Sequence, residues 1–405
     1  MSPTHGTARS FERSLKWQKR AEAVILGGGQ AHKRARLPGP LMIERGEGCR
    51  FWDVDGAEYI DYLMGYGPVV LGYAHPRVLQ AVAEQCARGN VFNVGHTLEV
   101  ELAEKLVEII PSAERVTFCV GGSDGTSGVI KLARAYTGRE KIVRSGYHGW
   151  HDWCHSERGA LLGTAAYTLT MAYNDLASLE RLFEQHRGGI ACVIMEPVGY
   201  EAPLPGYLEG VKQLCHDNGA LFVLDEVKTG FRYALGGAQE HFGVTPDLSV
   251  FSKAMGNGFG ICAITGSAEV MDDVAGVWVA ATFHGEMSLV AAALATIAEI
   301  EEKDGIEHMW HLGNMLLDGY REMTDRLGVE NVRLEGAGPM PFFGVTGGDE
   351  RLDAMRSTFY RETLDGGLYL PEAHIWFLSL AHTDADIART LEVSEAALRK
   401  GLAAA

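Results

Sequence analysis

Short apolar runs recur along the middle of the chain, and glycine or polar residues follow each of them. The clearest runs are 116–120, 142–143, 190–195, 221–224, 248–251 and 261–264. Between several of them lie stretches with helical spacing of apolar positions, such as Val129, Ile130 and Ala133. Short runs next to glycine favour strands over buried helices. Strands that alternate with helices predict a mostly parallel sheet covered on both faces.

The pattern changes near residue 300. The last third contains helix-like stretches near 288–306, 308–327 and 384–402, with strand-like stretches near 332–334 and 342–345. At the other end, a helix is expected before about Gln30, and 49–56 is typical of a strand followed by an Asp-Gly turn. A chain of 405 residues exceeds one ordinary core. We therefore expect an α/β protein with a large domain at 56–300 and a small α+β domain at 301–405, against which an N-terminal segment, 1–55, packs.

Composition narrows the class of partner. The formal net charge is −17, which disfavours nucleic acid and anionic membrane surfaces. No stretch has the apolar length of a membrane span, and residues 1–20 lack the apolar core of a signal peptide. The seven cysteines are widely spaced without a C-x-x-C pair, which is typical of reduced thiols. These features predict a cytoplasmic protein that binds small molecules.

The first candidate site follows the run at 116–120. Gly121, Gly122 and Ser123 lie between this expected strand and a helix. Free backbone N–H groups at a helix N-terminus favour an anion such as phosphate. The alternative is a structural cap provided by Ser123 or Asp124. No G-K-[ST] follows, so the turn is not a P-loop.

The second candidate is the loop 145–152, which contains Tyr147, His148, Trp150 and His151. An aromatic ring and imidazoles on a glycine-flanked loop could cover a flat heteroaromatic ligand. Zinc binding by the histidines and Asp152 is the less favoured alternative, because no H-E-x-x-H helix is present. Plain polar loop histidines are the third possibility.

Two further candidates stand at the ends of expected strands. Asp225 and Glu226 follow the run at 221–224, where ligands bind in open α/β sheets. A buried acid there needs a cationic partner, and a protonated pyridine nitrogen is one. Lys253 follows the run at 248–251 among small residues. A desolvated lysine becomes a nucleophilic amine, although a surface loop lysine is the commoner case.

Together the four signals match one cofactor. A phosphate anchor, an aromatic cover, a buried acid and an isolated lysine are what pyridoxal 5'-phosphate (PLP) requires. They occur in chain order on one expected sheet, which strengthens each of them.

At this point the chain resembles a known family, the class III PLP-dependent aminotransferases of fold type I, in the branch of the glutamate-1-semialdehyde 2,1-aminomutases. The resemblance extends from about residue 17 to 398. It rests on the motifs at 72–76, 147–152, 195–197, 224–232, 246–254 and 381–383. It implies a fold type I enzyme with a large PLP-binding domain, a small domain and a homodimeric assembly.

The resemblance also implies roles for individual residues. Lys253 would be the catalytic residue, holding the cofactor as a Schiff base and moving protons. Asp225 would pair with the pyridine nitrogen, and Thr282 would reach the phosphate of the neighbouring subunit. The other cofactor contacts that it implies are Gly121, Gly122, Ser123, Tyr147, His148, Glu196 and Val227. Substrate contacts are expected at Arg34, Tyr66 and His374, and no metal is expected.

Departures from the family pattern concern the substrate. The phosphate turn has Gly121 where the family has a serine, so it relies more on backbone N–H groups. The segment 153–173 is too short for the gating loop of true aminomutases. His374 replaces their glutamate, and Tyr66 replaces their tryptophan. We therefore expect an aminotransferase that moves an amino group from a small-molecule donor to a carbonyl acceptor. The alternatives are a PLP-dependent isomerase, either an aminomutase or an amino-acid racemase, and a catalytically silent relative.

Overall fold

The computed structural model describes residues 9–29, 41–154, 159–348 and 350–404. The chain divides into two compact units. The central unit comprises residues 67–70 and 76–307, and the terminal unit comprises 1–66, 71–75 and 308–405. These limits differ from the boundaries expected from the sequence, 55/56 and 300/301, which stay a prediction.

The central unit is built on a seven-stranded sheet with the order β4-β10-β9-β8-β7-β5-β6. Neighbouring strands from β9 to β6 are parallel, and β10 is antiparallel to both of its neighbours. The fold is therefore α/β with a mostly parallel sheet, as the alternating apolar runs predict. The strands are β4 (Arg115–Cys119), β5 (Lys141–Ser145), β6 (Thr168–Thr170), β7 (Ile190–Met195), β8 (Leu221–Asp225), β9 (Leu248–Phe251) and β10 (Cys262–Gly266).

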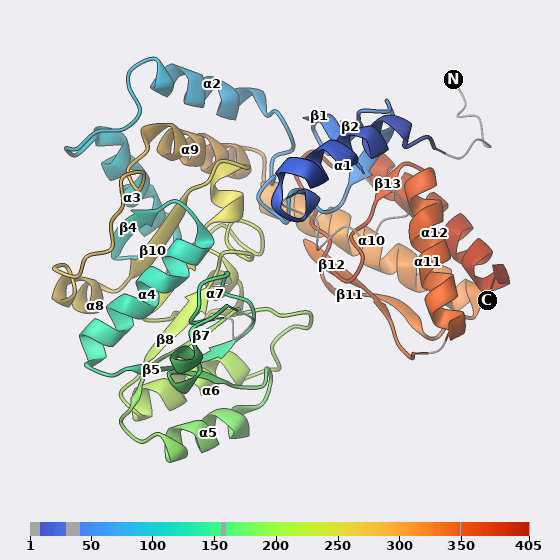
Figure 1. Cartoon of the computed structure of the whole chain (residues 1–405). Coiled ribbons are helices and arrows are strands. Elements are labelled where there is room, and N and C mark those ends of the chain that lie inside the picture. The colour runs from blue at the N-terminus through green and yellow to red at the C-terminus, as the bar shows by residue number, and fades with distance from the viewer. Residues whose placement is uncertain (1–8, 30–40, 155–158, 349, 405) are drawn as a thin grey trace. The chain divides into compact units, whose positions relative to one another are not determined.

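Helices cover both faces of this sheet (Figure 1). On one face α4 (Gly122–Thr137) buries Val129, Ile130 and Ala133 against strand residues that include Ile194 and Val223. On the other face α5 (Leu176–Gln185) and α6 (Tyr207–Asp217) form a second core with Phe222. The remaining helices of the unit are α2 (Pro76–Cys86), α3 (Thr97–Ile109), α7 (Ala238–Phe242), α8 (Ala268–Asp273) and α9 (Met287–Glu302), with short 3-10 turns at Leu162–Ala166 and Lys253–Gly256.

The terminal unit combines both ends of the chain. A four-stranded sheet has the order β1-β2-β3-β13, and β11 and β12 form a separate hairpin. An aromatic core holds the unit together, because Phe343 stacks on Phe359 and on the buried Trp376. The elements are α1 (Glu12–Val24), a 3-10 turn at Leu26–Gly28, β1 (Ile43–Glu47), β2 (Arg50–Asp53), β3 (Glu58–Asp61), α10 (Gly305–Leu327), β11 (Val332–Ala337), β12 (Met340–Val345), α11 (Glu350–Asp365), β13 (Leu368–Tyr369) and α12 (Asp384–Ala404).

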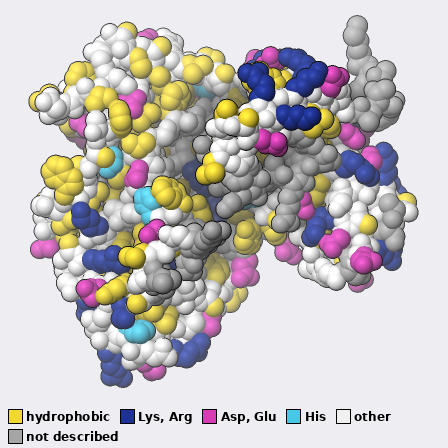
Figure 2. Space-filling model, in the orientation of Figure 1, with side chains coloured by type: hydrophobic (Ala, Val, Ile, Leu, Met, Phe, Trp, Pro, Cys, Tyr) yellow, Lys and Arg dark blue, Asp and Glu magenta, His cyan; other side chains and the backbone are white. Residues whose placement is uncertain are grey.

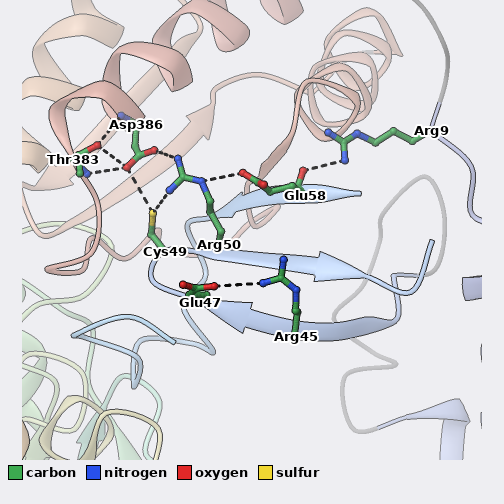
Figure 3. A network of polar contacts seen from close by, with 8 residues as sticks. All are labelled: Arg9, Arg45, Glu47, Cys49, Arg50, Glu58, Thr383 and Asp386. Atoms are coloured by element: carbon green, nitrogen blue, oxygen red, sulfur yellow. Dashed lines mark hydrogen bonds and ion pairs between the residues drawn. The ribbon is translucent and has the colours of Figure 1, made fainter. Parts of the chain in front are cut away.

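A polar network joins the two ends of the chain within the terminal unit (Figure 3). Arg50 on β2 forms ion pairs with Asp386 on α12 and with Glu58 on β3. The Asp386 carboxylate also accepts from the Thr383 hydroxyl (2.7 Å) and backbone N–H (3.0 Å) at the start of α12. The Cys49 thiol lies in the same network, 3.1 Å from an Arg50 nitrogen. Asp386 thus caps the last helix and anchors it to the N-terminal sheet.

Most elements expected from the sequence are confirmed. The runs at 190–195 and 248–251 form β7 and β9, and the other four runs form strands within about two residues. Short elements such as β6 and β13 and the helices α2, α3 and α11 were missed. β6 and β13 are brief, and α3 and α11 are rich in charged residues, which weakens their patterns, whereas α2 does have amphipathic spacing. Within the described residues, no helix has both the length and the apolar character needed to cross a membrane.

Candidate active site

The candidate residues gather at one edge of the central sheet. Strands β5, β7, β8 and β9 are parallel, so their carboxyl ends share an edge, which is where ligands bind in open α/β sheets. Tyr147 and His148 follow β5, and Glu196 follows β7. Asp225 ends β8, and Lys253 follows β9. The sheet therefore brings together residues that are more than a hundred positions apart.

Lys253 occupies an unusual backbone conformation, with a φ of 43°. A side chain with a Cβ is rarely found in this left-handed region, and such strain concentrates at functional sites. The side chain is only partly exposed. Burial, aided by the positive charge of Lys228, lowers the pKa of Lys253 to about 8. The amine is thus far easier to deprotonate than an ordinary lysine, as nucleophilic chemistry requires.

Asp225 is buried and held by fixed hydrogen bonds. One carboxylate oxygen lies 2.7 Å from Nδ1 of the buried His148, and the other accepts from the Val227 backbone N–H at 3.1 Å. The other ring nitrogen of His148 lies 3.1 Å from the Ser145 carbonyl. A carbonyl only accepts, so Nε2 carries a proton when this bond forms. His148 therefore orients Asp225.

Glu196 links the loop after β5 to a second lysine. Its carboxylate accepts from the Tyr147 backbone N–H at 3.1 Å and forms a 2.9 Å ion pair with Lys228. Burial opposes ionisation of Glu196, but the Lys228 charge and these hydrogen bonds outweigh it, so its pKa is lowered. The Tyr147 side chain remains about half exposed. Glu196 thus fixes the backbone of Tyr147 while its ring stays accessible.

The turn with Gly121 and Gly122 forms the start of α4, as phosphate binding at this turn requires. Gly121 is the N-cap and no side chain caps the helix, so the alternative that Ser123 or Asp124 caps it is wrong. The first N–H groups of a helix have no acceptor within it, and the helix dipole favours an anion there. A Cβ on Gly122 would lie 3.0 Å from the Val227 side chain, which places Val227 beside this turn.

The loop after β5 packs closely against the same helix end. The Thr126 hydroxyl donates to the His148 carbonyl at 2.7 Å. A Cβ on Gly149 would lie 2.3 Å from Oγ of Ser123, so only glycine permits this approach. His151 lies 2.6 Å from the Ser127 hydroxyl rather than beside His148. Within the described ranges, no cluster of three or more histidine, cysteine, aspartate or glutamate residues could hold a metal ion.

Glu226, the second carboxylate at the end of β8, has a structural role. Glu226 is fully buried and accepts from the backbone N–H groups of Ala238 (2.9 Å) and Gln239 (2.8 Å) at the start of α7. It also accepts from the Thr229 hydroxyl. The sequence analysis did not single out Lys228 beside it, although a cation within a strand-end acidic motif was a visible signal.

The remaining candidates come from other segments of the chain. Thr282 is exposed in the segment between α8 and α9. Tyr66 and His374 belong to the terminal unit, where their rings meet edge to face with centroids 5.0 Å apart. Tyr66 has a φ of 71°, another left-handed residue with a side chain. Arg34 lies outside the described residues.

The arrangement in the central unit fits PLP. The N-terminus of α4 suits its phosphate, and the buried Asp225 suits a protonated ring nitrogen. Lys253 offers an amine with a depressed pKa at the same sheet edge. These residues are therefore of the kinds that the cofactor needs for its phosphate, its ring nitrogen and its aldehyde.

Comparisons with known proteins agree with this geometry. The family model described as "Aminotransferase class-III" matches residues 31–398. A glutamate-1-semialdehyde 2,1-aminomutase from Brevibacillus brevis is 37% identical over 424 residues, covering 96% of this chain and 99% of that protein. A 3-aminobutyryl-CoA aminotransferase from Cloacimonas acidaminovorans is 35% identical over 405 residues, covering 96% and 97%.

Solved structures show the same fold. The PLP form of the FumI protein from Sphingopyxis sp. MTA144 is 33% identical with a TM-score of 0.91, covering 97% of each chain. An omega-transaminase from Sphaerobacter thermophilus is 27% identical with a TM-score of 0.89, covering 96% of this chain and 97% of that one. The chain belongs to the class III aminotransferases, a family of fold type I enzymes whose cofactor is pyridoxal 5'-phosphate.

Proposed function

We propose that this enzyme is an aminotransferase in which Lys253 holds PLP as a Schiff base and then moves protons during transfer between an amino donor and a carbonyl acceptor. The observation that carries the proposal is the position of Lys253. It is a strained, partly buried lysine with a pKa near 8, on the sheet edge that also presents Asp225. When bound, PLP supplies an electrophilic carbonyl and a ring that delocalises negative charge from the substrate carbon.

Each residue around the bound PLP is assigned a separate role. The N–H groups of Gly122 and Ser123, at the start of α4, bind the phosphate, and Val227 packs against one ring face. Tyr147 covers the other face, since its backbone is fixed by Glu196 and its ring is accessible. Asp225, held by His148, keeps the ring nitrogen protonated. The Lys253 amine would accept a proton from the substrate carbon and hold it for return, acting first as a general base and then as a general acid.

The same residues serve an isomerase, and the 37% identity to an aminomutase favours that second candidate. Two substitutions speak for transfer, because Tyr66 and His374 differ from the aminomutase pattern. The two functions differ in their need for an acceptor: an isomerase turns over one substrate alone, whereas a transferase needs a carbonyl compound for the second half-reaction.

The test combines spectroscopy with turnover. Protein reconstituted with PLP is screened against amino donors for a shift of its visible absorbance band, and productive donors are then assayed with and without a keto acid. Transfer predicts sustained turnover only with the acceptor. Lys253→Ala should lose the Schiff-base band and lower turnover by several orders of magnitude. Turnover without acceptor would favour the isomerase, and normal turnover by Lys253→Ala would refute the role of Lys253.

We also propose a homodimer with shared active sites. The central unit exposes apolar side chains over α2 and α3 and the segment between them, including Leu79, Phe92 and Val94 (Figure 2). An isolated monomer rarely leaves so many large apolar side chains in water. The segment is tied to the start of α9, since Val91 pairs with Glu286 and Asn90 donates to its carboxylate at 2.7 Å. Thr282, just before this point, would contact the phosphate of the partner subunit.

Sedimentation analysis tests the assembly, and Thr282→Ala tests the shared site. We expect a dimer and weaker PLP binding in the variant, whereas a monomer with full PLP affinity would contradict both.

The seven cysteines are all free thiols. They support a reducing compartment, the cytoplasm, as the place of action.

The substrate contacts complete the proposal. Tyr66 and His374, which pack on each other, would contact the substrate, and Arg34 would bind a substrate carboxylate with its two-pronged guanidinium. The substrate is therefore expected to be a small amino compound that carries an anionic group.

A further inference from the structure

A second lysine, which follows β8, has no place in the mechanism above. Lys228 follows β8 by three residues, and its side chain is 11% exposed. Its ammonium group forms a 2.9 Å ion pair with Glu196, whose side chain is 15% exposed. Lysine normally reaches into water, so this enclosed position needs an explanation.

Enclosure separates this pair from an ordinary surface salt bridge. Exposed pairs such as Lys400 and Glu362, 2.6 Å apart with 64% and 23% exposure, gain little because water screens them. Charges that are largely removed from water act more strongly on their neighbours. The largely buried charge of Lys228 therefore acts more strongly on neighbouring groups than the charge of an exposed lysine would.

One group that the Lys228 charge affects is Lys253. The charged groups that act on its amine are Lys228 and Arg232, which oppose its protonation, and Glu196 and Asp225, which favour it. Among these four the Lys228 charge has the largest influence after burial itself. It comes from the loop after β8, whereas Glu196 comes from the end of β7.

The other neighbour is the loop that carries Tyr147. One oxygen of Glu196 binds Lys228, and the other accepts the Tyr147 N–H at 3.1 Å. Gly146 permits this approach, because a Cβ there would lie 2.5 Å from the same Glu196 oxygen. The carboxylate is thus held from two sides, by a cation and by the backbone of the loop.

We propose that Lys228 is a positioning residue of this active site. It fixes Glu196 so that the Tyr147 loop keeps its place, and its charge disfavours protonation of the Lys253 amine. The inference deepens the proposed function, since it concerns the same lysine, but it depends only on Lys253 reacting with PLP and not on the fate of the amino group.

The experiment follows Schiff-base formation by the apo-protein. PLP is added over a range of pH, and the second-order rate constant is measured from the growth of the visible band. The neutral amine is the reacting species, so the rate rises with pH through the pKa of Lys253. In the wild-type protein the midpoint should lie near 8.

Lys228→Met removes the charge and keeps the length of the side chain. We expect the midpoint to rise by about one unit, with a rate about tenfold lower at pH 7, because a nearby like charge is lost. Lys228→Arg should behave as the wild type. Glu196→Gln should move the midpoint in the opposite direction. Lys400→Met, which breaks an exposed ion pair, is the matched control and should change nothing.

Circular dichroism of bound PLP reports the second effect. Lys228→Met should alter the ring signal, whereas Lys228→Arg should preserve it. If Lys228→Met does not fold, Lys228→Met combined with Glu196→Gln removes both charges and should still raise the midpoint, by a smaller amount. A midpoint and a ring signal identical to those of the wild type in these charge-removing variants would overturn the proposal.

The proposed function fails in a different way. If Lys253→Ala still forms the band, the assignment of Lys253 is wrong. If Lys253 reacts with PLP but no keto acid is aminated, the pH profiles of the Lys228 variants still test the role of Lys228.

Discussion

The close approach of Gly149 to Ser123 gives the sharpest test of the phosphate site. Gly149 has a φ of 107°, and an added Cβ would meet Oγ of Ser123 at 2.3 Å and its Cα at 3.0 Å. Unstrained carbon contacts lie near ~3.5 Å or beyond. The hydroxyl can rotate away, but the Cα moves only if the start of α4 moves. Gly149→Ala should therefore disturb the N–H groups that we expect to bind the phosphate.

Two costs contribute to the expected loss. The left-handed backbone costs an alanine about 1–3 kcal/mol wherever it occurs. The overlap with Ser123 adds a local cost, which is relieved by shifting the phosphate turn. If about 1.4 to 2.8 kcal/mol of binding energy is lost, the dissociation constant for PLP rises about 10- to 100-fold.

The assay is a titration of apo-protein with PLP, followed by absorbance, alongside a thermal melt. Gly56→Ala is the matched control, because Gly56 has a φ of 93° and no atom within 4 Å of its added Cβ. That variant should lose stability but not PLP affinity. Ser123→Ala measures the hydroxyl alone, worth about 1 kcal/mol. The reasoning is refuted if Gly149→Ala binds PLP as tightly as Gly56→Ala does.

Three further predictions concern stability, and urea denaturation checks each of them. Arg50→Ala leaves the Asp386 carboxylate, 4% exposed, without its cation and should cost about 2 kcal/mol. Arg45→Ala breaks an exposed pair and a contact over the Trp52 ring and should cost no more than about 1 kcal/mol; equal losses would contradict the network in Figure 3. Burial raises the pKa of Asp61 to about 6, from about 3.9 in the unfolded chain, so the folded state holds this proton more tightly and its contribution to stability falls as pH rises from about 4 to 6. The difference between wild type and Asp61→Asn should show this slope, and a difference that is flat with pH would disprove it. Gly125→Ala places a Cβ 2.3 Å from Sγ of Cys262 and should cost about 1–3 kcal/mol through overpacking. Gly276→Ala, with no atom within 4 Å of the added Cβ, should not lose stability in this way. A fully stable Gly125→Ala would show that the core adapts.

Much of the central unit could be predicted because its signals are local. The run at 248–251 is apolar, short and followed by small residues, so it indicates a buried strand whatever its neighbours are. The same holds for 190–195, all six residues of which are buried in β7. Parallel strands present their carboxyl ends at one edge, so Asp225 and Lys253 were expected at the same place. The elements missed, such as β13, are two-residue pairings that only a distant partner creates.

The sequence by itself determined the fold class, the family and the candidate lysine and acid, because periodicity and motif are properties of neighbouring residues. The tertiary structure alone decided which groups meet: that His148 binds Asp225 across 77 positions, and that Glu226 caps α7 instead of facing the sheet edge with Asp225. It also paired Lys228 with Glu196, and burial, aided by the Lys228 charge, lowers the pKa of Lys253. The physical reason is that a hydrogen bond or a pKa depends on distance and burial, which are set by how strands pair and loops pack. No pattern along the chain contains those quantities.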